Sequence, residues 1–283
     1  MDLISNSFIL TKPQRKNAQN HLNMYQFYSG IVVTFLGPYM MTLLVLSLNG
    51  GGYALGFVTS VLQFSTFFGI LVPVLLSNRD YVSNKVYFWK LRGYICLFYF
   101  AIIFLYEKLF VHWGVRGNQL AVLLICIVYG LFCLFRSVGF VSVFPIFNAS
   151  AIPQERGKIL SAYTRYAHVG SLSALFISYV VLYLAFFEKK NYSLLVLIFL
   201  GVIFNFIAAY KFKELPSIGV IPKMNVSEIM RRINGFLLDR KLFKLWVVRF
   251  FAEGMGICFG IASIAYLKKS RGLDDYNIFL FTL

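Results

Sequence analysis

Seven stretches of predominantly apolar residues follow one another along this chain, and each is long enough to cross a bilayer as a helix, which needs about 20 residues. An eighth begins near Asp275 and is cut off at Leu283. Backbone polar groups inside hydrocarbon must be satisfied within their own segment, so the stretches are predicted to be helices. The sequence therefore predicts an all-α integral membrane protein. The seven stretches are 24–48, 53–76, 86–106, 120–146, 158–186, 192–211 and 244–267.

The composition agrees with this class. Only 13% of the residues are charged and 59% are hydrophobic, and the mean hydropathy is +0.72, whereas soluble domains carry about 25% charged residues. A net charge of +16 would point to nucleic acid in a soluble chain. In a membrane protein the same excess marks cytoplasmic loops. We therefore expect the lipid bilayer as a partner and no nucleic acid.

The distribution of Lys and Arg predicts the orientation. Most of the 27 basic residues fall in alternate connections, which places these connections on the cytoplasmic side. We expect a multi-pass protein of the plasma (inner) membrane with a cytoplasmic N-terminus. Residues 1–22 lack a signal-peptide core and cleavage site. The basic connections are 1–24, 77–92, 151–165 and 211–249.

The longest connection, 212–243, contains VSEIMRRINGFLLDRK. Its apolar residues recur at helical spacing against three arginines, which predicts an amphipathic helix on the cytoplasmic membrane face. The apolar positions are Ile229, Ile233, Phe236 and Leu237, and the arginines are Arg231, Arg232 and Arg240.

Six spans, a basic linker and further spans suggest a repeat. The segment from Phe27, FYSGIVVTFLGPYMMTLLVLSLNGGGY, matches the segment from Phe251, FAEGMGICFGIASIAYLKKSRGLDDY, in a few Phe, Gly and Tyr positions. Among them are Phe27 with Phe251, Gly30 with Gly254, Gly37 with Gly260 and Tyr53 with Tyr276. A second pattern is AIPQERGKILSAYTRYAHVG, a turn carrying Pro153, Arg156 and Gly157 before small residues at helical spacing. Together these features resemble the major facilitator superfamily of secondary transporters.

The resemblance implies a six-helix bundle followed by the first one or two helices of a second bundle. The domains would be a cytoplasmic leader (1–23), the first bundle (24–211), the linker (212–243) and the start of the second bundle (244–283), with helix 7 and a truncated helix 8. The family also has a basic signature in the loop between helices two and three. Here Arg79 and Lys85 keep its basic character, but Asn78 replaces its Asp.

The resemblance further implies a solute site at mid-membrane, between the bundles. Arg136, His168 and Glu253 lie at about the same depth, roughly 15 Å from the cytoplasmic ends of their helices. Intramembrane ionisable residues are functional candidates. We expect substrate contacts from Arg136, Tyr129, His168 and Gln26, and proton coupling through Glu253, with H⁺ or Na⁺ as the coupling ion.

Structural explanations for the same residues stay open. Glu253 lies four residues after Arg249 and can pair with it along one helix face, or it can pair with Arg136. His168 can be a neutral residue at a helix interface, and Arg136 can bond backbone carbonyls. These roles require no solute.

Three other functions compete with transport. An enzyme is not expected, because no catalytic set is present and the four cysteines show no disulfide or metal-ligand spacing; no cofactor or metal is predicted. A seven-helix receptor conflicts with the cytoplasmic N-terminus. The remaining alternative is a non-transporting polytopic protein, either a scaffold or a half-transporter that needs a second chain. The principal prediction is a secondary transporter of a small solute.

Overall fold

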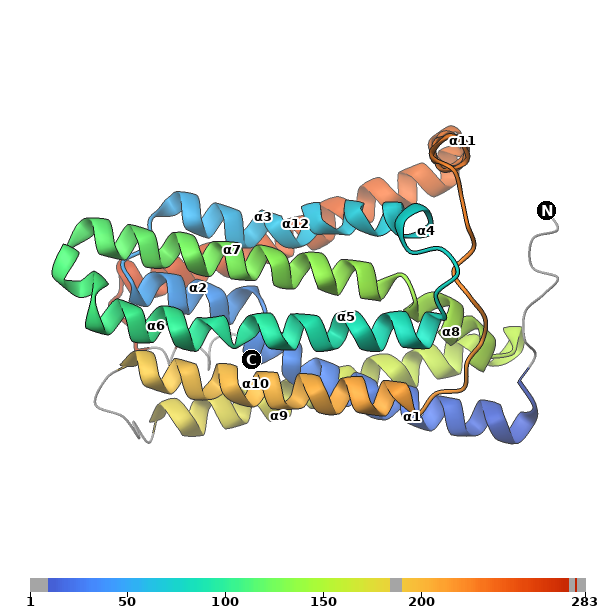
Figure 1. The fold of residues 1–283 in the computed structure, drawn as a ribbon, viewed down its shortest axis with the longest axis horizontal. Coiled ribbons are helices and arrows are strands. Elements are labelled where there is room, and N and C mark those ends of the chain that lie inside the picture. Colours follow the sequence, from blue (N-terminus) through green and yellow to red (C-terminus); the bar gives the residue numbers. More distant parts are fainter. Residues whose placement is uncertain (1–9, 184–189, 275–277, 279–283) are drawn as a thin grey trace.

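The computed structural model describes residues 10–183, 190–274 and 278. Over these residues the chain is helical, and extended pairing is limited to one antiparallel bridge between Asp80 and Val220. Most of the helices run along the longest axis of the molecule (Figure 1). The all-α prediction is therefore confirmed. The α-helices are α1 (Lys12–Leu36), α2 (Pro38–Ser47), α3 (Gly52–Phe68), α4 (Val72–Leu75), α5 (Tyr81–Cys96), α6 (Phe98–Lys108), α7 (Val115–Phe140), α8 (Val143–Ser150), α9 (Arg156–Tyr183), α10 (Lys190–Lys213), α11 (Val226–Leu238) and α12 (Arg240–Lys269), with 3-10 helices η1 (Gly69–Leu71), η2 (Phe110–Trp113) and η3 (Pro153–Glu155).

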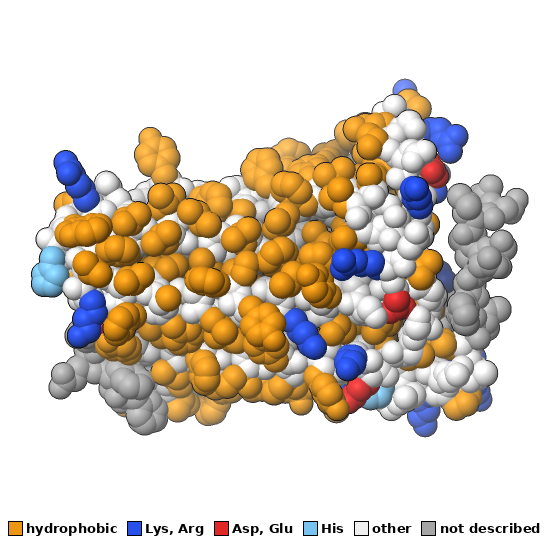
Figure 2. All heavy atoms as spheres, in the orientation of Figure 1, with side chains coloured by type: hydrophobic (Ala, Val, Ile, Leu, Met, Phe, Trp, Pro, Cys, Tyr) orange, Lys and Arg blue, Asp and Glu red, His pale blue; other side chains and the backbone are white. Residues whose placement is uncertain are grey.

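Seven helical segments in this part of the chain are long and apolar enough to cross a membrane, and they coincide with the seven apolar stretches of the sequence. Figure 2 shows hydrophobic side chains over the middle of one face, while Lys and Arg side chains lie at the left edge and over the right-hand part. By length and composition, this is a multi-pass membrane protein. The spans are Lys12–Ser47, Gly52–Leu75, Tyr81–Lys108, Val115–Ser150, Pro153–Tyr183, Tyr192–Lys213 and Arg240–Lys269.

Several helices begin before the apolar stretch that predicted them. α1 starts at Lys12, so the second half of the expected leader is helical, and α5 starts at Tyr81. The cause is N-terminal capping by polar residues, which a hydropathy average cannot detect. Asp80 accepts a 2.8 Å hydrogen bond from the Ser83 backbone N–H, and Asp239 caps α12 in the same way. The expected helix after Asp275 lies outside the described residues, apart from the buried Ile278.

Spans 1 and 4 are broken helices of equal length. Each has 36 residues, and in both the interruption comes about two-thirds of the way along. Gly37 is extended and Pro38 opens α2, as the Gly-Pro pair predicts. In span 4 the break falls at 141–142, between α7 and α8.

The six spans before the linker pair in a symmetric pattern. Span 1 packs against spans 5 and 6, span 4 packs against spans 2 and 3, and spans 3 and 6 pack on each other. Exchanging spans 1, 2 and 3 for spans 4, 5 and 6 reproduces the same set of main pairs. The bundle therefore has the pairing of two three-helix units related by a two-fold exchange.

Helices α1 and α9 cross with their backbones in close contact. A Cβ atom on Gly30 would lie 2.2 Å from the backbone oxygen of Ala167, and one on Gly170 would lie 2.0 Å from that of Phe27. The Ser171 hydroxyl donates a 3.2 Å hydrogen bond to the Gly30 carbonyl. Small residues that let backbones meet are the usual means of packing helices in membranes. Gly30 and Gly170 thus set the distance between the two helices.

The connection between α10 and α11 is tied to the loop before α5. The Ile221 N–H donates to the Arg79 carbonyl at 2.8 Å, and the Asn78 N–H donates to the Ile221 carbonyl at 2.9 Å. The Ser217 hydroxyl donates a 2.5 Å hydrogen bond to Asp80. The expected amphipathic helix is α11, with Ile229 buried and Arg231 exposed. Figure 1 shows α11 at one end of the molecule, beside α12.

The last described helix, α12, lies against α2 and α3. Gly260 faces the Tyr39 ring, with a Cβ position 2.7 Å from its hydroxyl oxygen. Towards α11 the helix diverges from α3, and most of its large apolar side chains are exposed. An apolar groove of about 820 Å³ separates the two helices, lined by Phe64, Phe67 and Trp246 among others. α12 therefore has only a partial packing partner in the described chain.

Candidate functional site

The interior of the bundle contains cationic side chains from α5. Lys85, Trp89 and Arg92 are spaced by four and three residues, which places them on one helix face. That helix packs against α7 and α10. Lys85 is 0% exposed, Arg92 is 1% exposed and Trp89 is 2% exposed. Two charged residues are thus enclosed within a membrane span.

Aromatic rings surround both cations. The Lys85 Nζ atom lies 2.8 Å from the centroid of the Trp89 ring, and the Arg92 guanidinium carbon lies 3.6 Å from it. The rings of Tyr25 and Phe140 are also within 6 Å of Lys85, at 5.3 and 5.4 Å. The face of an aromatic ring attracts a cation. These contacts therefore stabilise the buried charges.

A single amide from α10 orients the arginine. The Asn205 side chain is buried, and its oxygen accepts a 2.7 Å hydrogen bond from Arg92 Nε. Its nitrogen donates to the Trp89 carbonyl, also at 2.7 Å. Gly93 leaves space for this amide, because a Cβ there would lie 2.6 Å from Asn205 Nδ2. Arg92 is therefore held in one orientation with its remaining donors free to point elsewhere.

The buried groups that lack hydrogen-bond partners are concentrated on this span. Between Asn84 and Tyr99, five buried side-chain atoms of the described residues have no hydrogen-bond partner. Three of the five are nitrogen donors on the same face of α5, and only one is an acceptor without donor capacity. A cluster with unmet donors is complementary to a ligand that carries acceptor oxygens. The five atoms are Lys85 Nζ, Trp89 Nε1, Arg92 Nη2, Asn84 Oδ1 and the Tyr99 hydroxyl.

Arg136 of α7 supplies a third positive charge. It interacts electrostatically with Lys85, Arg92 and Tyr25, and its side chain is half-buried. In the described part of the chain none of the three cations forms an ion pair with a carboxylate. We call Lys85, Arg92 and Arg136 the cationic cluster. Arg136 is its least buried member.

The energetics of the cationic cluster are unfavourable without a counter-charge. Two like charges ~6 Å apart repel by about 3 kcal/mol at an effective dielectric constant of about 20, and burying each ion costs several kcal/mol more. A desolvated cation–π contact returns about 2 kcal/mol. The rings offset part of this cost but supply no lone pair to the unmet N–H groups. An anion would supply both charge and acceptors.

The residues predicted to bind solute are dispersed. Tyr129 is buried in the bundle core, stacked on Phe132, and it interacts electrostatically with Arg136. Gln26 is half-buried on α1, and His168 is exposed on α9. His168 makes no hydrogen bond or ion pair to another described residue. The structure thus associates Tyr129 with Arg136, and records no such contact for Gln26 or His168.

The other predicted residues occupy the ends of spans. Pro153 opens η3, while Arg156 and Gly157 begin α9, so these three form the expected turn between spans 4 and 5. Arg79 lies in the loop before α5 and is exposed. Glu253 falls on α12, but its side chain lies outside the described residues.

Lys85 corrects the sequence interpretation. It was expected in a cytoplasmic loop, but it lies inside α5 and is fully buried. Lys85 fell outside the predicted apolar stretch because α5 begins five residues before the window at 86. The spacing of Lys85, Trp89 and Arg92, together with the lone amide of Asn205 in an apolar run, carried the signal.

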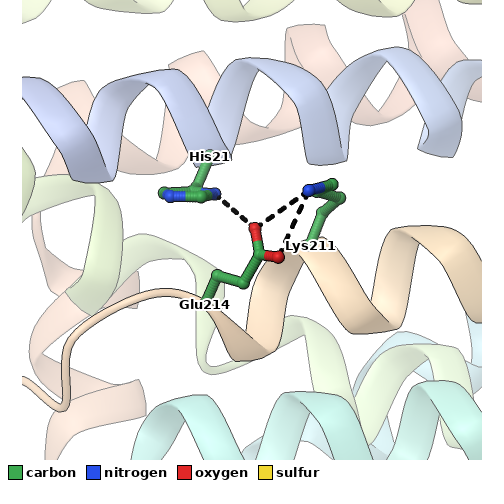
Figure 3. A network of polar contacts seen from close by, with 3 residues as sticks. All are labelled: His21, Lys211 and Glu214. Atoms are coloured by element: carbon green, nitrogen blue, oxygen red, sulfur yellow. Dashed lines mark hydrogen bonds and ion pairs between the residues drawn. The ribbon is translucent and has the colours of Figure 1, made fainter.

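A separate polar network joins the ends of two helices. Glu214 accepts from His21 Nδ1 at 2.8 Å and from Lys211 Nζ at 3.1 Å (Figure 3). The three side chains are partly exposed, and their contacts join α1 to the end of α10. The Glu214 carboxylate is thus engaged here and does not pair with the cationic cluster. No group of metal-ligating side chains is found among the described residues.

Comparisons with protein-family models, curated proteins and solved structures find no match to this chain. The functional argument therefore rests on the sequence and on the geometry of the bundle.

Proposed function

We propose that this chain forms the first bundle of a secondary transporter, organised as in the major facilitator superfamily, and that it moves a small solute by alternating access. The observation that carries the proposal is the symmetric pairing of the six spans. Transporters of that superfamily contain three-plus-three inverted repeats within each six-helix half. The packing of span 1 against spans 5 and 6, matched by the packing of span 4 against spans 2 and 3, fits this plan.

Two further features support it. Spans 1 and 4, which exchange with each other in this symmetry, are both interrupted helices, as are spans 2 and 3, and interrupted helices surround many transporter sites. The cationic cluster lies at the junction of spans 3, 4 and 6. Buried ionisable groups in a membrane mark solute and ion pathways.

In this proposal α12 begins a second bundle. Its exposed apolar side chains and the groove beside α3 leave room for further helices. These helices come from the same protein or from a partner chain. In this proposal the N-terminus is cytoplasmic, and Glu253 couples transport to H⁺ or Na⁺. The protein catalyses no enzymatic reaction in this proposal.

The test is solute flux in sealed proteoliposomes. The protein is extracted from its own membrane so that any partner is retained, and its intact mass is recorded. Labelled carboxylates, phosphate, amino acids and sugars are then tested one by one. A carrier gives saturable uptake that is accelerated by the same solute on the opposite side. Flux without this acceleration indicates a channel, and no flux above protein-free vesicles contradicts the proposal.

A further inference from the structure

We infer that the cationic cluster binds the oxyanion group, a carboxylate or phosphate, of the transported solute. This inference rests on the proposed function and adds the chemical class of the substrate. It depends on three observations that are independent of the family resemblance: uncompensated positive charge, unmet donors and a fixed arginine.

The first observation is charge. Lys85 and Arg92 both lie close to the Trp89 ring, and Arg136 adds a third cation from α7, which packs against α5. No described carboxylate pairs with them, and the carboxylate of Glu214 is engaged by His21 and Lys211. A neutral solute would leave this charge uncompensated, whereas an anion would compensate part of it.

The second observation is hydrogen bonding. Lys85 Nζ, Arg92 Nη2 and Trp89 Nε1 are all buried donors without partners. Carboxylate and phosphate oxygens accept several hydrogen bonds at once, and those from charged donors are about twice as strong as neutral ones. Halide ions lack the separate oxygens that these spread donors require. An oxyanion therefore fits better than a simple anion.

The third observation is pre-organisation. Asn205 fixes Arg92 Nε, so the unpaired Nη2 edge of the guanidinium has a defined direction. Gly139 and Gly93 leave space for Trp89 and Asn205, with Cβ positions 3.0 and 2.6 Å from their side chains. Binding groups whose rotamers are locked by their neighbours lose little entropy when a ligand arrives. Arg136, the third cation, is half-buried.

The test measures thermal stabilisation of the purified protein in neutral detergent, with inorganic phosphate, sulfate and succinate as probes and sodium chloride at matched ionic strength as reference. The wild-type protein is expected to show saturable stabilisation by at least one oxyanion. Lys85→Met and Arg92→Gln are each expected to weaken the apparent affinity at least tenfold. Lys90→Met removes a cation from an exposed position of the same helix and is expected to leave the affinity unchanged.

A fourth variant guards against loss of folding. Asn205→Asp places a carboxylate against Arg92 without changing the size of the side chain. It is expected to retain a cooperative unfolding transition and to lose the response to free oxyanions, because the internal carboxylate replaces them. An unchanged oxyanion affinity in Asn205→Asp would overturn the inference.

Further measurements distinguish a lipid headgroup from a free solute as the source of the oxyanion. They also distinguish failure of the oxyanion site from failure of the transport proposal. Micelles doped with phosphatidylglycerol are compared with phosphatidylcholine; stabilisation by the anionic lipid alone would overturn a solute site. Equal responses in all variants, or none in the wild type, would do the same. Oxyanion binding without flux would retain the inference and remove transport. Saturable flux of a neutral sugar that is unchanged in Lys85→Met and Arg92→Gln would support transport and contradict oxyanion binding by the cationic cluster.

Discussion

The α1/α9 crossing and the cationic cluster lie in the same bundle and are held by opposite means. At the crossing, Gly30 and Gly170 bring two backbones into contact, and the nearby Ser171 hydroxyl has a hydrogen-bond partner. In the cluster, large charged side chains are enclosed with several donors unmet. Packing at the α1/α9 crossing stabilises the folded protein, whereas the unpaired buried charges of the cationic cluster destabilise it. The difference indicates which region serves as scaffold and which serves the ligand.

The largest effect is expected at the crossing. Gly30→Ala places a methyl group 2.2 Å from the Ala167 carbonyl oxygen, and a backbone atom cannot move aside as a side chain can. We expect a loss of about 3 kcal/mol in the free energy of unfolding, measured by thermal unfolding in detergent. Gly56→Ala on α3 is the control, because nothing lies within 4 Å of its Cβ position. Similar stability of the two variants would refute a scaffold role for the crossing.

The next effect concerns the amide that holds the arginine. Asn205→Leu removes the acceptor of Arg92 Nε and leaves a buried charged donor unpaired. The expected loss is about 2 kcal/mol, read from the unfolding midpoint without added oxyanion. The same exchange at Asn20, which is exposed on α1, should be close to neutral. A neutral result at Asn205 would mean that the rings alone support Arg92.

A gain in stability is expected from Lys85→Met. Lys85 makes no hydrogen bond, and removing an uncompensated buried charge at similar volume stabilises proteins in several systems. We expect a gain of about 1 kcal/mol in oxyanion-free buffer, against a change within about 0.5 kcal/mol for Lys90→Met. A loss of stability at Lys85 would assign it a scaffold role like that of Gly30.

The smallest effect is expected in the linker, outside both the α1/α9 crossing and the cationic cluster. Ser217→Ala removes the hydrogen bond to Asp80, and we expect a loss of about 0.5 kcal/mol. Hydrogen exchange should accelerate at the Ile221 amide, which pairs with Arg79. Ser227→Ala, exposed on α11, provides the control. Unchanged exchange would show that the backbone bridge holds the linker without the side chain.

The sequence predicted the spans better than the site. An average over about 20 residues tolerates single polar residues, so all seven spans were found. Averaging kept Arg92 inside the predicted stretch 86–106, but the charge count assigned it with Lys85 to the basic connection 77–92. The hydrogen bond that holds Arg92 comes from Asn205 of another helix, a tertiary contact that no local pattern contains. Arg136 was identified because its neighbours in sequence are apolar.

Asp80 uses both oxygens of its carboxylate. One holds the first turn of α5 through the Ser83 amide, and the other holds the linker through Ser217. A displacement of the linker is therefore transmitted to the start of the helix that carries Lys85, about one and a half turns further on. Tension between the two halves of such a protein would reach the helix of the cationic side chains through Asp80 and through the backbone bridge between Ile221 and Arg79 beside it.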